Sequence, residues 1–113
     1  MKRYVLALDL VDDAQRMAEY EAAHVGIWPQ VREHLHATGV LNMEIYRLGT
    51  RMCMVMEVDE ALYTPQAAAI AAAHNPVIQE WETLMWRYQQ ATPWTPAGEK
   101  WTEMKRIFDL SVQ

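Results

Sequence analysis

The sequence predicts an α+β domain whose strands and helices follow the order β-α-β-β-α-β. Apolar residues alternate near the N-terminus and in the middle of the chain, and they recur at helical spacing in two longer stretches. Glycine or proline separates these stretches. The length of 113 residues is typical of one domain, so we expect residues 1–113 to form a single domain.

The first expected strand covers residues 3–10, and one of its faces is apolar: Tyr4, Leu6, Leu8 and Leu10. Asp12 or Asp13 can cap the helix that follows. An apolar stripe of roughly 80° then contains Met17, Tyr20, His24, Ile27, Val31 and Leu35. Pro29 disfavours helical geometry at Trp28, so we expect a kink or two helical pieces.

Two strands, 40–47 and 51–58, are predicted to form a hairpin with Gly49 in its turn. One face of the first strand would carry Leu41, Met43 and Ile45, and one face of the second Met52, Met54, Met56 and Val58. Residues 64–75 and 76–90 have helical patterns, each with a proline near its start. A loop and a last strand over residues 104–110 complete the prediction.

This order is the one found in ferredoxin-like folds, in which an antiparallel sheet has its helices on one face. The other face needs a cover, because apolar residues also occupy alternate positions there. A second copy of the chain is the simplest cover, so we expect a homodimer.

Composition narrows the range of functions. The net charge is −5, and no basic cluster of the kind that binds nucleic acid is present. No stretch approaches the length of a membrane-spanning helix. The short apolar run at the N-terminus is unlike a signal peptide, and the single cysteine fits a reducing compartment, so we expect a cytoplasmic protein.

Tyr20 and His24 are four residues apart and are therefore neighbours on one helix face. Both could be structural, with buried rings and one satisfied polar atom each. They could equally line a pocket for a polyhydroxylated ligand, with Trp28 one turn later. Trp81 could pack on the apolar face of a sugar ring or could belong to the core.

The remaining chemistry-bearing residues give no recognisable site. His34 and His36 point to different sides of a helix, and the four histidines have no zinc-site spacing, so we expect no metal. The methionines of the second hairpin strand indicate core packing, and Cys53 lacks an activating motif. No phosphate-binding loop is present, and we expect no cofactor.

Nearly the whole chain resembles the L-rhamnose mutarotase family, in the stretches "EYEAAHVGIWPQV", "LNMEIYR", "MCMVMEV" and "VIQEWETLM". The most specific element is Tyr20, His24, Ile27, Trp28 and Pro29 in their relative spacing. The resemblance implies a dimeric enzyme that interconverts sugar anomers without a cofactor. It implies that His24 is the acid/base residue, that Tyr20 contacts the sugar and that Trp81 lines the pocket.

The chain departs from the family pattern at three places. Val25-Gly26 replaces Asn-Pro, Met43 replaces a tyrosine, and Glu82 replaces a second tryptophan. Met43 and Glu82 are therefore further candidates for sugar contacts, and the sugar can be L-rhamnose, L-fucose or another aldose.

Anomer exchange needs one proton donor and one acceptor, and an imidazole serves both roles because its unperturbed pKa is about 6.5. We expect His24 to transfer the proton, Tyr20 to assist, Trp81 to stack on the sugar and Trp28 to form a wall. Two alternatives remain open at this point. One is a cofactor-independent or haem-degrading monooxygenase on the same fold, and the other is a non-catalytic sugar-binding module.

Overall fold

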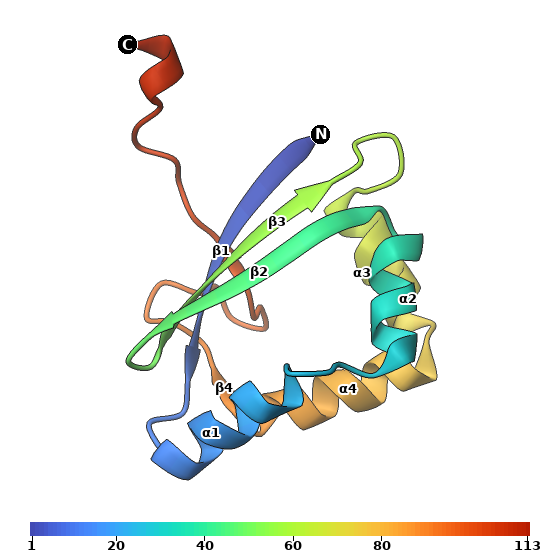
Figure 1. The fold of residues 1–113 in the computed structure, drawn as a ribbon, viewed down its shortest axis with the longest axis vertical. Helices are drawn as coiled ribbons and strands as arrows, with labels where there is room; N and C mark the ends of the chain where they lie inside the picture. The colour runs from blue at the N-terminus through green and yellow to red at the C-terminus, as the bar shows by residue number, and fades with distance from the viewer.

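Four helices pack on one side of an antiparallel sheet in the computed structural model of residues 1–113 (Figure 1). The elements are β1 (Lys2–Leu10), α1 (Ala14–Ala23), α2 (Pro29–Ala37), β2 (Val40–Leu48), β3 (Arg51–Val58), α3 (Pro65–Ala73), α4 (Pro76–Trp86), β4 (Gln89–Gln90), β5 (Thr102–Glu103) and a 3₁₀ turn (Leu110–Val112). None of the helices combines the length and the apolar character needed to cross a lipid bilayer.

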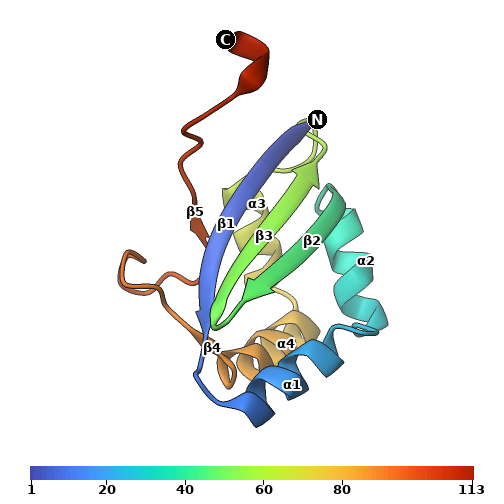
Figure 2. The same cartoon turned by 60° about the vertical axis from the view of Figure 1, so that its left-hand side comes forward.

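The sheet has the strand order β2-β3-β1-β4, and β5 also pairs with β1 (Figure 2). β1 pairs antiparallel with β3 from Lys2 opposite Val58 to Asp9 opposite Arg51. The β2–β3 hairpin turns at Gly49, whose φ of 59° lies in the left-handed region that favours glycine. This topology confirms the predicted ferredoxin-like α+β fold.

The fourth strand position differs from the prediction. Residues 104–110 were expected to form the last strand, but residues 104–109 have no regular structure. β4 and β5 instead share the edge of β1, separated by the loop 91–101. The backbone amide of Met104 still bonds the Val5 carbonyl, and beyond it Ile107 and Phe108 are exposed because no apolar surface of the same chain lies against them.

Local signals place the helix starts, and the break between α1 and α2, where the sequence predicts them. The Asp13 side chain accepts a hydrogen bond from the Arg16 amide and begins α1. The predicted break is confirmed, because α1 ends at Ala23 and α2 begins at Pro29. Pro29, Pro65 and Pro76 each occupy the first turn of a helix, where the missing N–H costs nothing.

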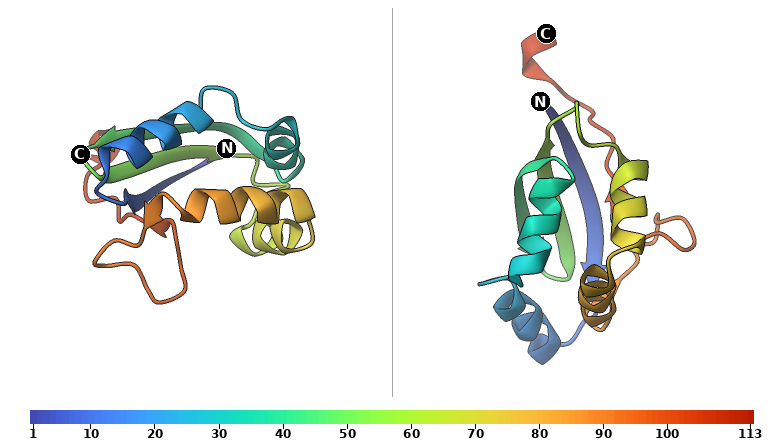
Figure 3. Two further views of the ribbon diagram at one scale, coloured as in Figure 1. Left: turned by 90° about the horizontal axis from the view of Figure 1, so that it is seen from below. Right: turned by 90° about the vertical axis from the view of Figure 1, so that its right-hand side faces the viewer.

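The core lies between the helices and the inner face of the sheet, where α2 and α3 lie on opposite sides of this face and each contacts α4 (Figure 3). The most completely buried side chains are Leu8, Leu10, Met52 and Val58. One predicted face needs correction: Leu41 does not share the inner face with Met43 and Ile45. A β-bulge between Val40 and Asn42 leaves Leu41 without a partner on β3, and it is exposed.

Candidate active site

A cavity of about 610 Å³ lies between the inner face of the sheet and the helices, in the range of small-molecule sites. It adjoins a more open recess of about 860 Å³ between β2 and the segment that links α1 to α2. Tyr20, His24 and Met43 line both spaces. A ligand could therefore enter beside β2 and reach the interior next to the tyrosine–histidine pair.

His24 ends α1, and its ring is fixed to the backbone of the same helix. Its Nδ1 atom lies 2.8 Å from the Tyr20 carbonyl oxygen. A carbonyl oxygen only accepts hydrogen bonds, so Nδ1 carries the proton in this contact. The neutral imidazole then has its lone pair on Nε2, which makes no hydrogen bond to the protein. This half-buried histidine therefore presents an Nε2 atom without a protein partner at the cavity.

The Tyr20 ring lies beside that of His24, with centroids 4.4 Å apart, and the residue is only 4% exposed. The Gln89 side-chain amide donates a hydrogen bond to the Tyr20 hydroxyl oxygen at 3.2 Å. Burial raises the pKa of Tyr20 above its usual value of 10.0, the Gln89 hydrogen bond lowers it, and the Glu82 carboxylate raises it. The hydroxyl consequently keeps its proton at neutral pH and can donate it.

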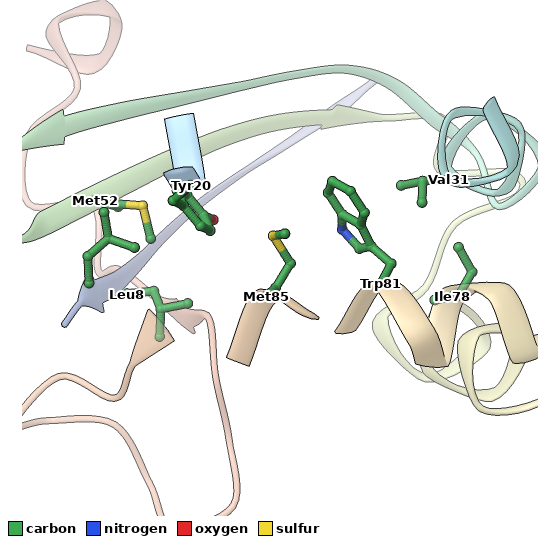
Figure 4. Packing of buried hydrophobic residues seen from close by; sticks show 8 residues of the cluster. Leu8, Tyr20, Val31, Met52, Ile78, Trp81 and Met85 are labelled. Carbon is green, nitrogen blue, oxygen red and sulfur yellow. The ribbon is translucent and has the colours of Figure 1, made fainter. Parts of the chain in front are cut away.

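Tryptophan packing closes the cavity on the side of α4. Tyr20 and Trp81 both project into the space between the sheet and α4 (Figure 4). The Trp81 ring meets His24 edge-on at 5.6 Å between centroids and Trp28 at 5.1 Å. Trp28 lines neither the cavity nor the recess and instead contacts the Trp81 ring edge-on. Trp28, which was predicted to form a wall of the pocket, therefore lies outside the cavity and touches it only through Trp81.

Glu82 lines the cavity one residue after Trp81. Its Oε2 atom lies 2.5 Å from the ammonium group of Lys100, which also sits 4.4 Å from the ring centroid of Trp86. Lys100 belongs to the loop 91–101, so this ion pair joins the loop to α4. Glu99 and Trp101 of the same loop also line the cavity.

The structure therefore brings together five of the six predicted site residues: Tyr20, His24, Met43, Trp81 and Glu82. Sequence reasoning missed Gln89 and Trp101. Gln89 lay inside a predicted helix of residues 76–90, whereas α4 ends at Trp86 and Gln89 belongs to β4. No local pattern indicates which residue of the Gln89-Gln90 pair faces inward, because β4 is too short to show alternation. No group of three or more histidine, cysteine or acidic side chains is arranged to hold a metal ion.

This fold and site define a class: a small α+β protein whose interior cavity holds a tyrosine, a histidine with a free Nε2 and an indole wall. The L-rhamnose mutarotase family model matches residues 3–110, so the chain belongs to this family, as the resemblance predicted. It is an anomer-interconverting isomerase, and the monooxygenase and binding-module alternatives are not favoured.

Individual relatives agree with this assignment. An L-fucose mutarotase of Xanthomonas campestris is 47% identical over 98% of this chain and 90% of its own length. A UPF0734 protein of Dictyostelium discoideum is 34% identical over 96% of this chain and 90% of its own. The crystal structure of an L-rhamnose mutarotase from Formosa agariphila has a TM-score of 0.69 at 18% identity, covering 97% of this chain and 99% of the other. A polyketide cyclase of Streptomyces glaucescens, tetracenomycin F2 cyclase, has a TM-score of 0.59 at 20% identity, covering 96% and 98%. At these identities the two structures establish the fold alone.

Proposed function

We propose that residues 1–113 act as one cytoplasmic mutarotase domain that interconverts the α and β anomers of a 6-deoxyhexose, L-fucose in preference to L-rhamnose. The observation that carries the reaction is the pairing of a free imidazole nitrogen with a protonated, buried hydroxyl in one cavity. The preference for L-fucose is supported by the 47% identity with the Xanthomonas L-fucose mutarotase.

In the proposed reaction, Nε2 of His24 accepts the proton of the anomeric hydroxyl while the Tyr20 hydroxyl protonates the ring oxygen. The bond between the anomeric carbon and the ring oxygen breaks, and the open-chain aldehyde forms. Rotation about the adjacent carbon–carbon bond exposes the other face of the aldehyde. Reclosure reverses both proton transfers, so protons and charge balance over the cycle. General acid–base catalysis of this kind increases the reaction rate by about 10²–10⁴-fold.

The other residues orient the sugar. Trp81 offers its indole face to the apolar side of the pyranose, and Trp28 holds that ring in place. Met43 and Glu82 replace aromatic side chains of the family pattern, so they leave room and add one carboxylate. Glu82 can accept hydrogen bonds from sugar hydroxyls while Lys100 holds it.

The test is NMR saturation transfer between the anomeric protons of L-fucose and of L-rhamnose, with and without the protein. We expect faster exchange for both sugars, more so for L-fucose, and loss of this acceleration in His24→Ala. No acceleration of either sugar would contradict the proposal. Sugar binding by the wild type with an unchanged exchange rate would instead support the binding-module alternative. Oxygen uptake in the presence of quinols would support the monooxygenase alternative.

We further propose that two copies pair through the outer face of the sheet. Val5, Ala7, Cys53 and Val55 on this face have no helix over them. The segment 104–113 leaves the body of the chain with a row of exposed apolar residues: Ile107, Phe108, Leu110 and Val112. A second copy would cover both the face and the segment, since isolated chains rarely expose so much contiguous apolar surface.

Light scattering coupled to size-exclusion chromatography tests the homodimer. The wild type should have twice the mass of one chain, and Phe108→Asp should shift the equilibrium towards the monomer. Ile70→Asp is a matched control, because Ile70 is similarly exposed (61%) but lies on α3. A monomeric wild type, or a dimer insensitive to Phe108→Asp, would contradict the proposed interface.

A further inference from the structure

We propose that Gln89 contacts the sugar and determines which hydroxyl pattern the site accepts, by acting as a pair with Tyr20. This inference rests on the proposed function and extends it to a residue that neither the sequence nor the family resemblance identified. The ligand feature we assign to Gln89 is one hydroxyl of a pyranose whose ring oxygen faces the Tyr20 hydroxyl.

The first observation is the burial of an incompletely bonded amide. Gln89 is only 6% exposed and lines the cavity. Its Nε2 atom donates to the Tyr20 hydroxyl oxygen, but its Oε1 atom is the buried side-chain atom that has no hydrogen-bond partner. If the amide were turned so that Oε1 faced Tyr20, the Nε2 group would be left unpaired instead, because Tyr20 is the sole side chain hydrogen-bonded to the Gln89 amide. Buried polar groups are normally satisfied, so a polar ligand group is the natural partner.

The second observation is the direction of the hydrogen bonds. Because the Tyr20 oxygen accepts from Gln89, its own proton remains available to a ligand. The pair therefore presents one donor, the Tyr20 hydroxyl, beside one acceptor, Gln89 Oε1. The ring oxygen of a pyranose only accepts a hydrogen bond and a sugar hydroxyl can donate one, so such a pair can bind a ring oxygen and a hydroxyl at the same time. An analogue lacking that hydroxyl would leave the buried Oε1 atom of Gln89 unpaired.

The third observation is the rigidity of the position. Gln89 pairs with Leu10 of β1, which is 1% exposed, and the neighbouring Tyr88 carbonyl accepts a hydrogen bond from the Val11 amide at 2.8 Å. The amide is thus held by the sheet and is not on a mobile loop. A fixed acceptor discriminates between hydroxyl positions better than a flexible one can.

The chain supplies a matched control, because the next residue, Gln90, is exposed. We would compare wild type, Gln89→Leu and Gln90→Leu in anomer exchange with L-fucose and its mono-deoxy analogues. Gln89→Leu should lower kcat/KM for L-fucose by about 10- to 100-fold, whereas Gln90→Leu should not. For one deoxy analogue, kcat/KM of the wild type should be lower than for L-fucose by a similar factor. For Gln89→Leu, kcat/KM with that analogue should be no lower than with L-fucose. This non-additivity identifies the hydroxyl that Gln89 contacts, and a purely structural role would not produce it.

Gln89→Met, which keeps the length of the side chain without its amide, serves as a second variant if Gln89→Leu does not fold. Unchanged kcat/KM and unchanged analogue discrimination in a folded variant would overturn the inference while leaving the mutarotase function intact. If the wild type accelerates anomer exchange of no 6-deoxyhexose, the proposed function is contradicted instead. In that case the side-chain amide signals of Gln89 during a titration with L-fucose decide the inference: a shift supports contact with the sugar, and no shift overturns it.

Discussion

The Nδ1 atom of His24 lies 2.8 Å from the carbonyl oxygen of Tyr20, one helical turn earlier in α1. The same contact recurs at the end of α3, where Nδ1 of His74 lies 2.9 Å from the carbonyl oxygen of Ile70. Both histidines end their helices, but His74 is exposed and lines neither the cavity nor the recess, whereas His24 faces Tyr20 and Trp81. The chain thus contains an internal comparison between a structural and a candidate catalytic histidine.

Replacing His24 by asparagine should remove catalysis without unfolding α1. The asparagine amide can still donate to the end of the helix, but it cannot accept and release a proton near neutral pH. We expect the rate of anomer exchange to fall about 10²–10⁴-fold, measured by NMR saturation transfer. His74→Asn removes the equivalent ring and should leave the rate unchanged. Equal effects of the two substitutions would show that the ring of His24 is structural.

Tyr20 should make the stability of the protein sensitive to alkaline pH. Burial raises the pKa of its hydroxyl above 10.0, so the folded state holds this proton more tightly than the unfolded state does. Its contribution to stability is therefore fully present below the unfolded pKa and is lost as the pH rises through the folded pKa. Urea unfolding between about pH 9 and pH 11 should show a smaller loss in Tyr20→Phe than in the wild type. Parallel pH profiles would contradict this, because Tyr63, whose pKa is also raised, is present in both proteins.

Trp81 should contribute strongly to stability as well as to sugar binding. It is 7% exposed and contacts Trp28 and His24, so truncation leaves a large void between α4 and the segment before α2. Trp81→Ala should lower the free energy of unfolding by about 3–5 kcal/mol in chemical denaturation. Trp94, at 74% exposure, provides the comparison, and Trp94→Ala should change the free energy of unfolding by about 0.5 kcal/mol or less.

Gly39 should be the least replaceable glycine. Its φ is 99°, and a Cβ atom added there would lie 2.9 Å from the Cβ of Leu62 and 3.1 Å from the backbone nitrogen of Tyr63. Gly39→Ala should cost about 1–3 kcal/mol in thermal or chemical unfolding. Gly26 has no positive φ and no atom within 4 Å of such a Cβ, so Gly26→Ala should be neutral or slightly stabilising. A similar loss in both variants would contradict the steric argument.

The elements predicted correctly are those whose evidence is local. Alternation in β1 and β3, the Asp13 cap and Pro29 each act within a few residues, and the structure agrees with all of them. The expected strand 104–110 was wrong because a segment with apolar residues does not by itself supply a partner: β1 already pairs with β4 and β5 along that edge. The bulge that turns Leu41 away from the core likewise depends on the register with β3.

The same distinction, between local evidence and contacts of residues distant in the chain, holds for the candidate site. The spacing of Tyr20 and His24 on one helix was sufficient to place them together, and the structure brings them within 4.4 Å between ring centroids. Gln89 is 69 residues from Tyr20 along the chain, so its contact depends on how α4 and β4 return to the sheet. Periodicity carries no information about such a contact.

Two short strands, β4 and β5, share the edge of β1, and this arrangement has an evolutionary consequence. Gln89–Gln90 and Thr102–Glu103 are each paired with β1 independently, so the register of the sheet does not depend on the length of the loop between them. Insertions or deletions in residues 91–101 can be tolerated while both anchors remain in place. Because this loop supplies Glu99 and Trp101 to the cavity, changes in its length would alter the accepted sugar without disturbing Tyr20 or His24. New substrate preferences could therefore arise through this one segment, while the proposed proton-transfer residues stay under separate constraint.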